Sequence, residues 1–278
     1  MEQTKNYFEE MWDRYFPNCE LPIVSYFSDQ LNGVDVAEPL SPEQEGHTCV
    51  FRQLEPVRSG GTLALDKKTI GCTGFSSQMG FSYDEEYLED DVSFLCDMVR
   101  YKKSHELFEQ TIRPYPFIAA PGKYIIFKRW DLLNENDTPE IVNFFANPDA
   151  LTGLYMLANY DEPSPFGVVM PWGPACSSMV NYPMRELDAD NPKSFLGGFD
   201  PTARCTIEPA DTLIFSVPWP KFMRMLENME ASFLSVDLAS GEAAVSRFAS
   251  WHDHFVEANS IDDSIWKGIM NRLADAPQ

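Results

Sequence analysis

The chain has 278 residues, and its 43 acidic and 21 basic side chains give a formal net charge of −22 at pH 7. A hydrophobic fraction of 44% supplies a buried core and excludes wholesale disorder. Because so negative a surface repels phosphate backbones and anionic lipid headgroups, we expect no nucleic-acid partner and no membrane partner. No stretch approaches the about 20 apolar residues of a membrane helix, and residues 1–16 lack the basic start of a secretory signal.

Helices and strands are predicted in irregular alternation along the chain. Apolar residues at helical spacing predict a helix over residues 3–16, which Pro17 ends. β-branched and aromatic runs predict strands at residues 21–27, 62–65, 123–131, 141–145, 168–170 and 212–217. Further helices are expected at residues 49–57, within 84–113, at 147–158 and at 221–233. This order predicts an α+β fold, with a mixed or antiparallel sheet and flanking helices.

The order of a cysteine turn, a strand, a proline and a helix occurs twice. Residues 141–157 align with 212–228 when Phe145 is placed on Phe215 and Pro148 on Pro218. We interpret this as the hypothesis of an internal duplication, with a pseudo-twofold axis and the two cysteine turns meeting near it. The chain is then expected to be a single α+β domain over residues 1–278. Its parts are halves at 45–160 and 161–235, a helical N-terminal addition at 1–17 and a helical C-terminal addition at 236–278.

Two cysteine turns are the candidate binding site. Cys72 lies between small residues in Gly71–Gly74, and Cys176 follows the turn Trp172-Gly173-Pro174-Ala175. Small residues let a ligand approach the backbone, and a helix that begins at Ser177 would offer N–H groups to an anion or lower the pKa of the thiol. Trp172 is expected to line the site. The alternative is that both cysteines are small core residues in tight bends.

Six cysteines spread over so long a chain favour reduced thiols and therefore a cytoplasmic location. Four of them lie next to residues typical of turns, namely Cys49, Cys72, Cys176 and Cys205. Four thiolates are the number of ligands that an iron–sulfur cluster or a structural zinc ion requires. The chain contains no Cys-x-x-Cys pair, which is the spacing that makes a metal motif specific. An iron–sulfur or zinc site from these four thiols is therefore one hypothesis among several.

Four segments together resemble domain-of-unknown-function family 169. They are Gly71–Gly74 with Met79–Phe81, Phe144–Asp149 with Leu157–Tyr160, Met170–Ser178, and Phe199–Arg204. The resemblance covers about residues 45–235 and implies an uncharacterised prokaryotic family, common in anaerobes and archaea, without a settled activity. It also implies that both cysteine turns and the Asp200–Arg204 segment are features of the family.

Three functions remain open at this point. In the first, the cysteine turns, Trp172 and Arg204 bind a metal centre or a small anionic ligand, with Arg204 paired to a carboxylate or phosphate. In the second, Cys176 or Cys72 is the nucleophile or redox centre of a thiol enzyme. In the third, the protein is structural or binds another protein. We favour binding, because no histidine lies near either cysteine in the sequence, and we expect a homodimer because that is the usual state of such proteins.

Overall fold

The computed structural model describes residues 1–34, 49–82, 92–112, 114 and 119–235. Within these residues, one sheet has the strand order β2-β3-β1-β4-β7-β6-β5. Its strands are β1 (Ile23–Ser28), β2 (Thr62–Leu65), β3 (Tyr124–Arg129), β4 (Ile141–Ala146), β5 (Val168–Val169), β6 (Ser194–Gly197) and β7 (Leu213–Pro218). Neighbours pair antiparallel except β5 and β6, which are parallel. The predicted α+β class with a mixed sheet is confirmed.

Five helices of the described residues lie close to where the sequence predicts them: α1 (Glu2–Tyr15), α2 (Val50–Arg58), α5 (His105–Ile112), α6 (Pro148–Ala158) and α9 (Trp219–Asn228). Three short helices were not predicted: α3 (Thr73–Gln78), α7 (Tyr182–Met184) and α8 (Pro201–Arg204). The described part of the chain also contains two π-helices, η2 (Phe94–Met98) and η4 (Ser177–Asn181), and two 3₁₀ turns, η3 (Trp130–Leu132) and η5 (Phe233–Ser235). Helix α9 begins two residues before its predicted start, because Pro220 fits the first turn of a helix. None of these helices is long and apolar enough to cross a membrane.

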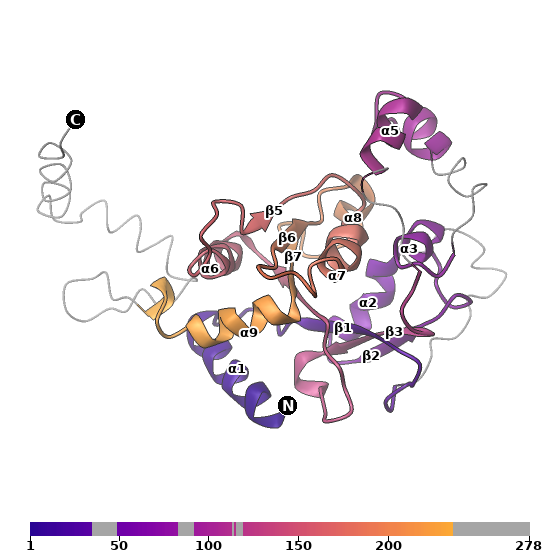
Figure 1. The fold of residues 1–278 in the computed structure, drawn as a ribbon. Coiled ribbons are helices and arrows are strands. Elements are labelled where there is room, and N and C mark those ends of the chain that lie inside the picture. The colour runs from indigo at the N-terminus through magenta and orange to yellow at the C-terminus, as the bar shows by residue number, and fades with distance from the viewer. Residues whose placement is uncertain (35–48, 83–91, 113, 115–118, 236–278) are drawn as a thin grey trace, which may run out of the picture.

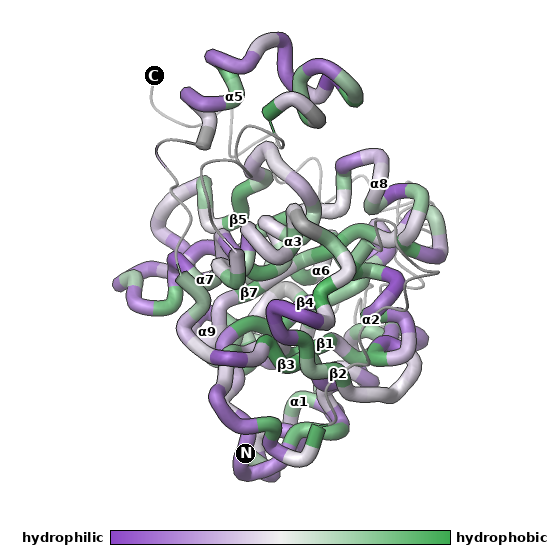
Figure 2. The backbone as a smooth tube through the Cα atoms, turned by 90° about the vertical axis from the view of Figure 1, so that its right-hand side faces the viewer, coloured by the Kyte–Doolittle hydropathy of each residue, from purple (hydrophilic) through white to green (hydrophobic). Residues whose placement is uncertain are grey.

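Helices cover both faces of the sheet (Figure 1). On one face α1, α6 and α9 enclose a first core with the strand residues Tyr26, Phe144 and Phe215. On the other face α2, α3, η4 and α8 enclose a second core with Ile125 and Phe127. The central strands are buried on both faces because both faces are covered. Most of their side chains are apolar, and the buried polar ones, Ser25, Asn143 and Ser216, hydrogen-bond to one another. In Figure 2 the hydrophobic segments accordingly gather around the sheet.

Helix α1 belongs to the first core. Phe8 is 1% exposed, and its ring centroid lies 4.5 Å from that of Trp130 and 5.4 Å from that of Phe222. Trp12 stacks on Phe16 and lies 5.1 Å from Phe144. The predicted N-terminal addition therefore completes one side of the core.

The two predicted repeats meet at the centre of the sheet. Strands β4 and β7 are antiparallel neighbours, and α6 and α9 pack together on the same face. The residues that precede the two helices, Asn147 and Pro218, are 218 − 147 = 71 positions apart. This is the offset of the predicted ranges, since 212 − 141 = 71, whereas placing Phe145 on Phe215 and Pro148 on Pro218 requires an offset of 70. In a strand a shift of one residue exchanges the faces.

The twofold relation does not extend through the sheet. β1 lies between β3 and β4, whereas β6 lies directly beside β7. The outer pairs differ as well, because β2 and β3 are antiparallel and β5 and β6 are parallel. The outer strands of the two halves are thus arranged differently, and the duplication stays a hypothesis for the β4–α6 and β7–α9 units.

A small lobe with α5 stands apart from the sheet (Figures 1 and 2). Its own apolar cluster contains Val92, Leu95, Cys96 and Phe108. The first part of the helical stretch predicted within 84–113 lies outside the described residues, as does the predicted C-terminal helical addition at 236–278.

Candidate functional site

The starts of four helices meet at the second core. Cys49 precedes α2, Cys72 precedes α3, Cys176 precedes η4 and Asp200 precedes α8. Cys72 and Cys176 are members of the same buried cluster, and Cys49 packs against it. Three of the four cysteines predicted as metal ligands therefore come together from distant parts of the chain. We call Cys49, Cys72, Cys176 and Asp200 the thiol cluster.

Cys205, the fourth predicted ligand, is an exposed residue at the end of α8. The hydroxyl of its neighbour Thr206 donates a hydrogen bond to the Thr202 carbonyl over 2.7 Å, and its interaction with Cys49 partly offsets the rise that burial causes in the pKa of Cys49. Asp200 is thus the acidic group that α8 contributes.

The Cys72 side chain caps α3. Its Sγ accepts a hydrogen bond from the backbone N–H of Phe75 over 3.3 Å. An N-cap side chain satisfies one of the N–H groups that the first turn of a helix leaves unbonded. The residue is 9% exposed.

Cys176 is the most deeply buried thiol of the cluster. Burial raises its pKa well above the ordinary value of 9.0, and the negative charges of Cys72, Asp200 and Cys49 raise it further. Burial also raises the pKa of Cys49. A nucleophilic cysteine needs a lowered pKa and access to substrate, so these surroundings disfavour Cys176 as the nucleophile of a thiol enzyme.

The N–H groups expected to bind an anion are already bonded. The Asp200 carboxylate accepts hydrogen bonds from Ala175 N over 2.7 Å and from Ala203 N over 3.0 Å. The N–H of Ser177 bonds to the carbonyl oxygen of Pro174. Asp200 therefore occupies the position that a small anion would take, and its own charge opposes a second anion there.

Buried hydrogen bonds connect the two predicted cysteine turns. The Ser177 hydroxyl donates to Gln78 Oε1 over 2.9 Å, and Asn181 Nδ2 donates to the Gln78 carbonyl over 2.6 Å. Ser177 and Asn181 are 2% and 4% exposed. Because these hydrogen bonds connect α3 to η4, they hold the Cys72 and Cys176 turns against one another.

Trp172 and Arg204 make other contacts than the sequence predicts. Trp172 packs on the α5 lobe, with the Lys102 ammonium 3.9 Å from its ring centroid and Phe108 edge-on at 6.1 Å. Arg204 donates a hydrogen bond to the carbonyl oxygen of Thr212. No ion pair joins Arg204 to any of the described residues, so its role in binding an anion stays a prediction.

The present side-chain arrangement is not that of a metal centre. Among the described residues, no three His, Cys, Asp or Glu side chains are placed so that they could hold a metal ion together. The three thiols of the cluster are neighbours, but they do not converge on one point.

Comparison with known families gives one result. The family model described as DUF169, uncharacterised ArCR, matches residues 22–228. The chain belongs to the DUF169 family. No curated protein and no solved structure gives a significant match. The matched residues of this DUF169 protein contain the whole thiol cluster, whereas α1, which completes the first core, precedes them.

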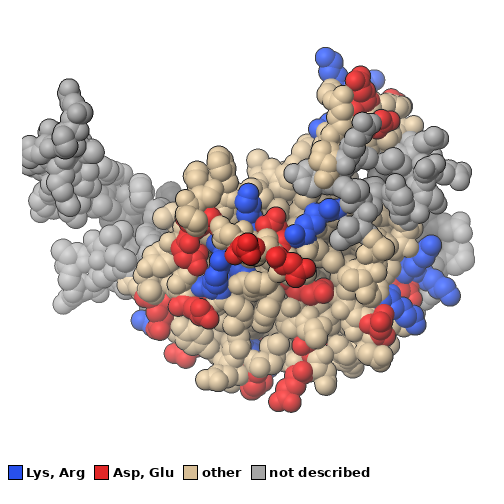
Figure 3. Space-filling view, viewed as in Figure 1, with Lys and Arg blue, Asp and Glu red and all other residues tan. Residues whose placement is uncertain are grey.

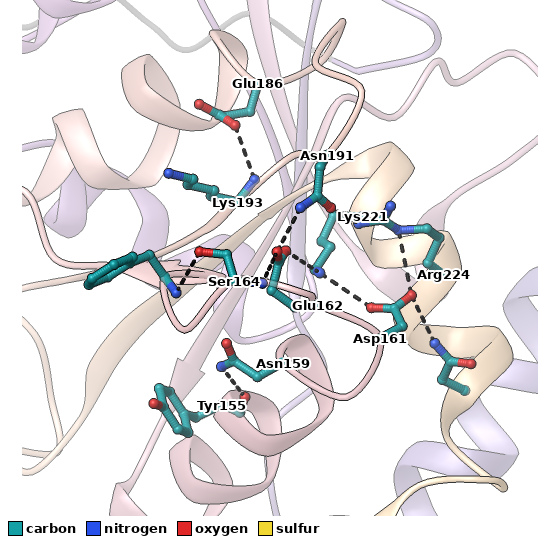
Figure 4. Close-up of polar contacts among 12 residues, drawn as sticks. Tyr155, Asn159, Asp161, Glu162, Ser164, Glu186, Asn191, Lys193, Lys221 and Arg224 are labelled. Carbon is teal, nitrogen blue, oxygen red and sulfur yellow. Dashed lines mark hydrogen bonds and ion pairs between the residues drawn. The ribbon is translucent and has the colours of Figure 1, made fainter.

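A second polar cluster of this DUF169 protein was not predicted from its sequence. Lys221 is 0% exposed, and Figure 4 shows it between Asp161 and Glu162, with Asn191 and Arg224 beside them. Lys221 lies on the buried side of α9 next to Phe222. A lysine on an apolar helix face is the signal that could have found this cluster, because a buried ammonium needs a carboxylate partner.

The raised thiol pKa predicts a loss of stability in alkali. Native Cys176 keeps its proton above pH 9.0, whereas the unfolded chain releases it there, so the stability that this thiol contributes falls as pH rises. From about pH 9 to about pH 10, Cys176→Ala is expected to reduce the decline in the free energy of unfolding by about 1 kcal/mol. Urea unfolding at several pH values measures this. The exposed Cys205→Ala variant should decline like the parent protein, and equal slopes for all three proteins would contradict the prediction.

Proposed function

We propose that this DUF169 protein binds a thiophilic metal ion through Cys49, Cys72 and Cys176. The observation that carries the proposal is that buried Cys72 and Cys176 lie beside partly buried Cys49 and the partly buried Asp200 carboxylate, each at the start of a helix. Cysteine thiolates and carboxylates are ligands of zinc, and cysteine thiolates hold iron–sulfur clusters.

Electrostatics supports a cation as the ligand. The charges of Cys72, Asp200 and Cys49 each raise the pKa of Cys176, so the cluster as it stands opposes its own ionisation. A bound cation reverses this effect, because it stabilises thiolates and displaces their protons. No lysine, arginine or histidine forms an ion pair with Asp200 among the described residues.

Coordination requires a local rearrangement. Since no three ligands are in place for a metal ion, the thiol side chains would have to turn toward one point. Cys72 would then release the N–H of Phe75, which its sulfur now accepts. Metal sites are commonly completed only when the ion binds, because the binding free energy drives the closure.

Cobalt titration of the metal-free protein tests this proposal. Cobalt bound by thiolates gives a strong near-ultraviolet charge-transfer absorption, and we expect this band at one equivalent of cobalt. Cys49→Ser, Cys72→Ser and Cys176→Ser should each weaken or abolish it. Serine is a good N-cap residue, so Cys72→Ser keeps the start of α3 while removing the thiolate. Cys205→Ser is the matched control and should bind like the parent protein.

The same experiment has a stability readout. Zinc at a hundredfold excess over its dissociation constant should raise the free energy of unfolding by about 2.7 kcal/mol, and binding should release protons from the thiols. A protein that binds neither cobalt nor zinc, or that loses binding only in Cys205→Ser, contradicts the proposal. The thiols would then be packing residues of the second core.

A further inference from the structure

The buried Lys221 ammonium has too few close partners. It lies 3.4 Å from Asp161 Oδ1 and 3.5 Å from Glu162 Oε2. Charged hydrogen bonds between nitrogen and oxygen are usually about 2.7–2.9 Å long. An ammonium carries three N–H donors, and Lys221 makes one long hydrogen bond, to Asp161, within the described residues.

Glu162 has one oxygen that is satisfied and one that is not. Its Oε1 accepts hydrogen bonds from Ser164 N over 3.1 Å and from Asn191 Nδ2 over 2.7 Å. Its Oε2 is buried and accepts none from the described residues, and the side chain as a whole is 1% exposed. Burial favours the neutral acid, but these hydrogen bonds and the Lys221 charge lower the pKa of Glu162, so the buried group is a carboxylate.

Ser194 supplies a third incomplete group on the same side of the sheet. Its hydroxyl is fully buried and has no hydrogen-bond partner among the described residues. The backbone N–H of Ser194 bonds to the Gly167 carbonyl over 2.9 Å, and a Cβ atom on Gly167 would lie 2.6 Å from Glu162 Cγ. Leu196, two residues along β6, packs in the first core with α9. Ser194 therefore lies on the face of β6 that packs toward α9, and its backbone is bonded to Gly167, which is in contact with Glu162.

We propose that a buried water molecule bridges Lys221 Nζ, Glu162 Oε2 and Ser194 Oγ. The water accepts a hydrogen bond from Lys221 and donates one to Glu162. It either donates its second hydrogen to the Ser194 hydroxyl or accepts the hydrogen of that hydroxyl. Three polar partners are the usual number for a buried water. The two cations Lys221 and Arg224 balance the two carboxylates Asp161 and Glu162, so the site favours a neutral molecule with both donors and acceptors. Acidic and basic side chains are also intermingled on the surface that Figure 3 shows.

The water links three separate segments of the chain. Glu162 belongs to the turn after α6, Ser194 begins β6, and Lys221 lies in the first turn of α9. Asn191 adds a direct bridge, because its amide donates to Glu162 and its oxygen accepts from Arg224 Nη2 over 3.0 Å. The site therefore secures the edge of the sheet near β5 independently of the thiol cluster.

A crystal structure that resolves ordered waters tests the proposal directly. The expected result is a density peak within hydrogen-bond distance of Lys221 Nζ, Glu162 Oε2 and Ser194 Oγ. A map in which these three atoms are well ordered and no peak lies between them overturns it.

The Ser194→Ala variant gives a second, independent test in solution. If the water is present, the variant removes one of its partners and should raise the unfolding equilibrium constant roughly two- to tenfold. If the Ser194 hydroxyl is simply unbonded, its removal should leave the constant unchanged or lower it, because a buried unpaired hydroxyl is unfavourable. Ser77→Ala serves as the control for loss of a buried serine hydroxyl with no partner among the described residues. A Ser194→Ala protein as stable as the parent overturns the proposal.

Discussion

Replacing Lys128 by methionine is expected to lower the free energy of unfolding by about 3–5 kcal/mol, because the partner carboxylate is left buried without its cation. Lys128 Nζ lies 2.7 Å from Asp137 Oδ1, and the two side chains are 3% and 0% exposed. Asp137 also accepts hydrogen bonds from the Tyr26 hydroxyl and from Asn134 N. The loss should appear as a lower urea midpoint with an unchanged slope.

Two controls distinguish the effect of losing this buried ion pair from the effect of losing a charge on the surface. Glu230→Gln alters an ion pair with Arg14 whose side chains are more than half exposed, and it should cost less than about 1 kcal/mol. The double variant Lys128→Met with Asp137→Leu removes both buried charges and should recover much of the loss. If Lys128→Met and Glu230→Gln lower the free energy of unfolding equally, the Lys128–Asp137 pair is not buried as described.

The Phe8→Ala variant should destabilise the protein by about 3–5 kcal/mol, because it leaves a cavity in the first core. Phe8 lies within 6.3 Å, centroid to centroid, of the rings of Trp12, Trp130, Phe144 and Phe222. The residue precedes the part of the chain that matches the DUF169 family. The variant therefore asks whether a segment outside the family match is part of the core.

Asn6→Ala is the matched control on the same helix. Asn6 is exposed, and alanine is the better helix former, so the change should be within about 0.5 kcal/mol. Thermal and urea unfolding measure both variants. If Phe8→Ala is as mild as Asn6→Ala, α1 does not dock on the sheet as described.

Local pattern predicted the longer helices and most strands but not the arrangement of the elements. The strand at Thr62–Leu65 was predicted at its observed bounds because Gly60 and Gly61 mark its start. Asn147 and Pro148 likewise marked the start of α6. The short helices α3, α7 and α8 were not predicted. The position of β1 between β3 and β4 depends on long-range pairing, for which residues 23–28 carry no local signal.

The buried charges were missed for a related reason. Lys128 lies in a strand, and in a sequence a charged strand residue indicates a solvent-exposed position. Burial of the Lys128 ammonium is favourable only because the turn that carries Asp137 places a carboxylate beside it. The same holds for Lys221 and Glu162, which are 59 positions apart. A sequence shows the charge of such a residue but not the partner that permits its burial.

The candidate site was predicted in part. The sequence drew attention to Cys72 and Cys176 through their small neighbours, and the structure places both in one core. It did not distinguish Cys205, which is exposed, from Asp200, which turns inward to the N–H of Ala175. That choice depends on the short helix α8, whose proline and capping aspartate direct the carboxylate to the helix start.

The metal content of protein purified without oxygen and without a metal-affinity step shows whether the thiol cluster binds a metal. Elemental analysis together with the ultraviolet–visible spectrum distinguishes an iron–sulfur cluster from a zinc ion, because an iron–sulfur cluster absorbs visible light and zinc does not. We expect one stoichiometric metal centre, lost in Cys176→Ser and retained in Cys205→Ser. A colourless, metal-free protein that also fails to take up zinc or cobalt would contradict the account and leave the three thiols as packing residues.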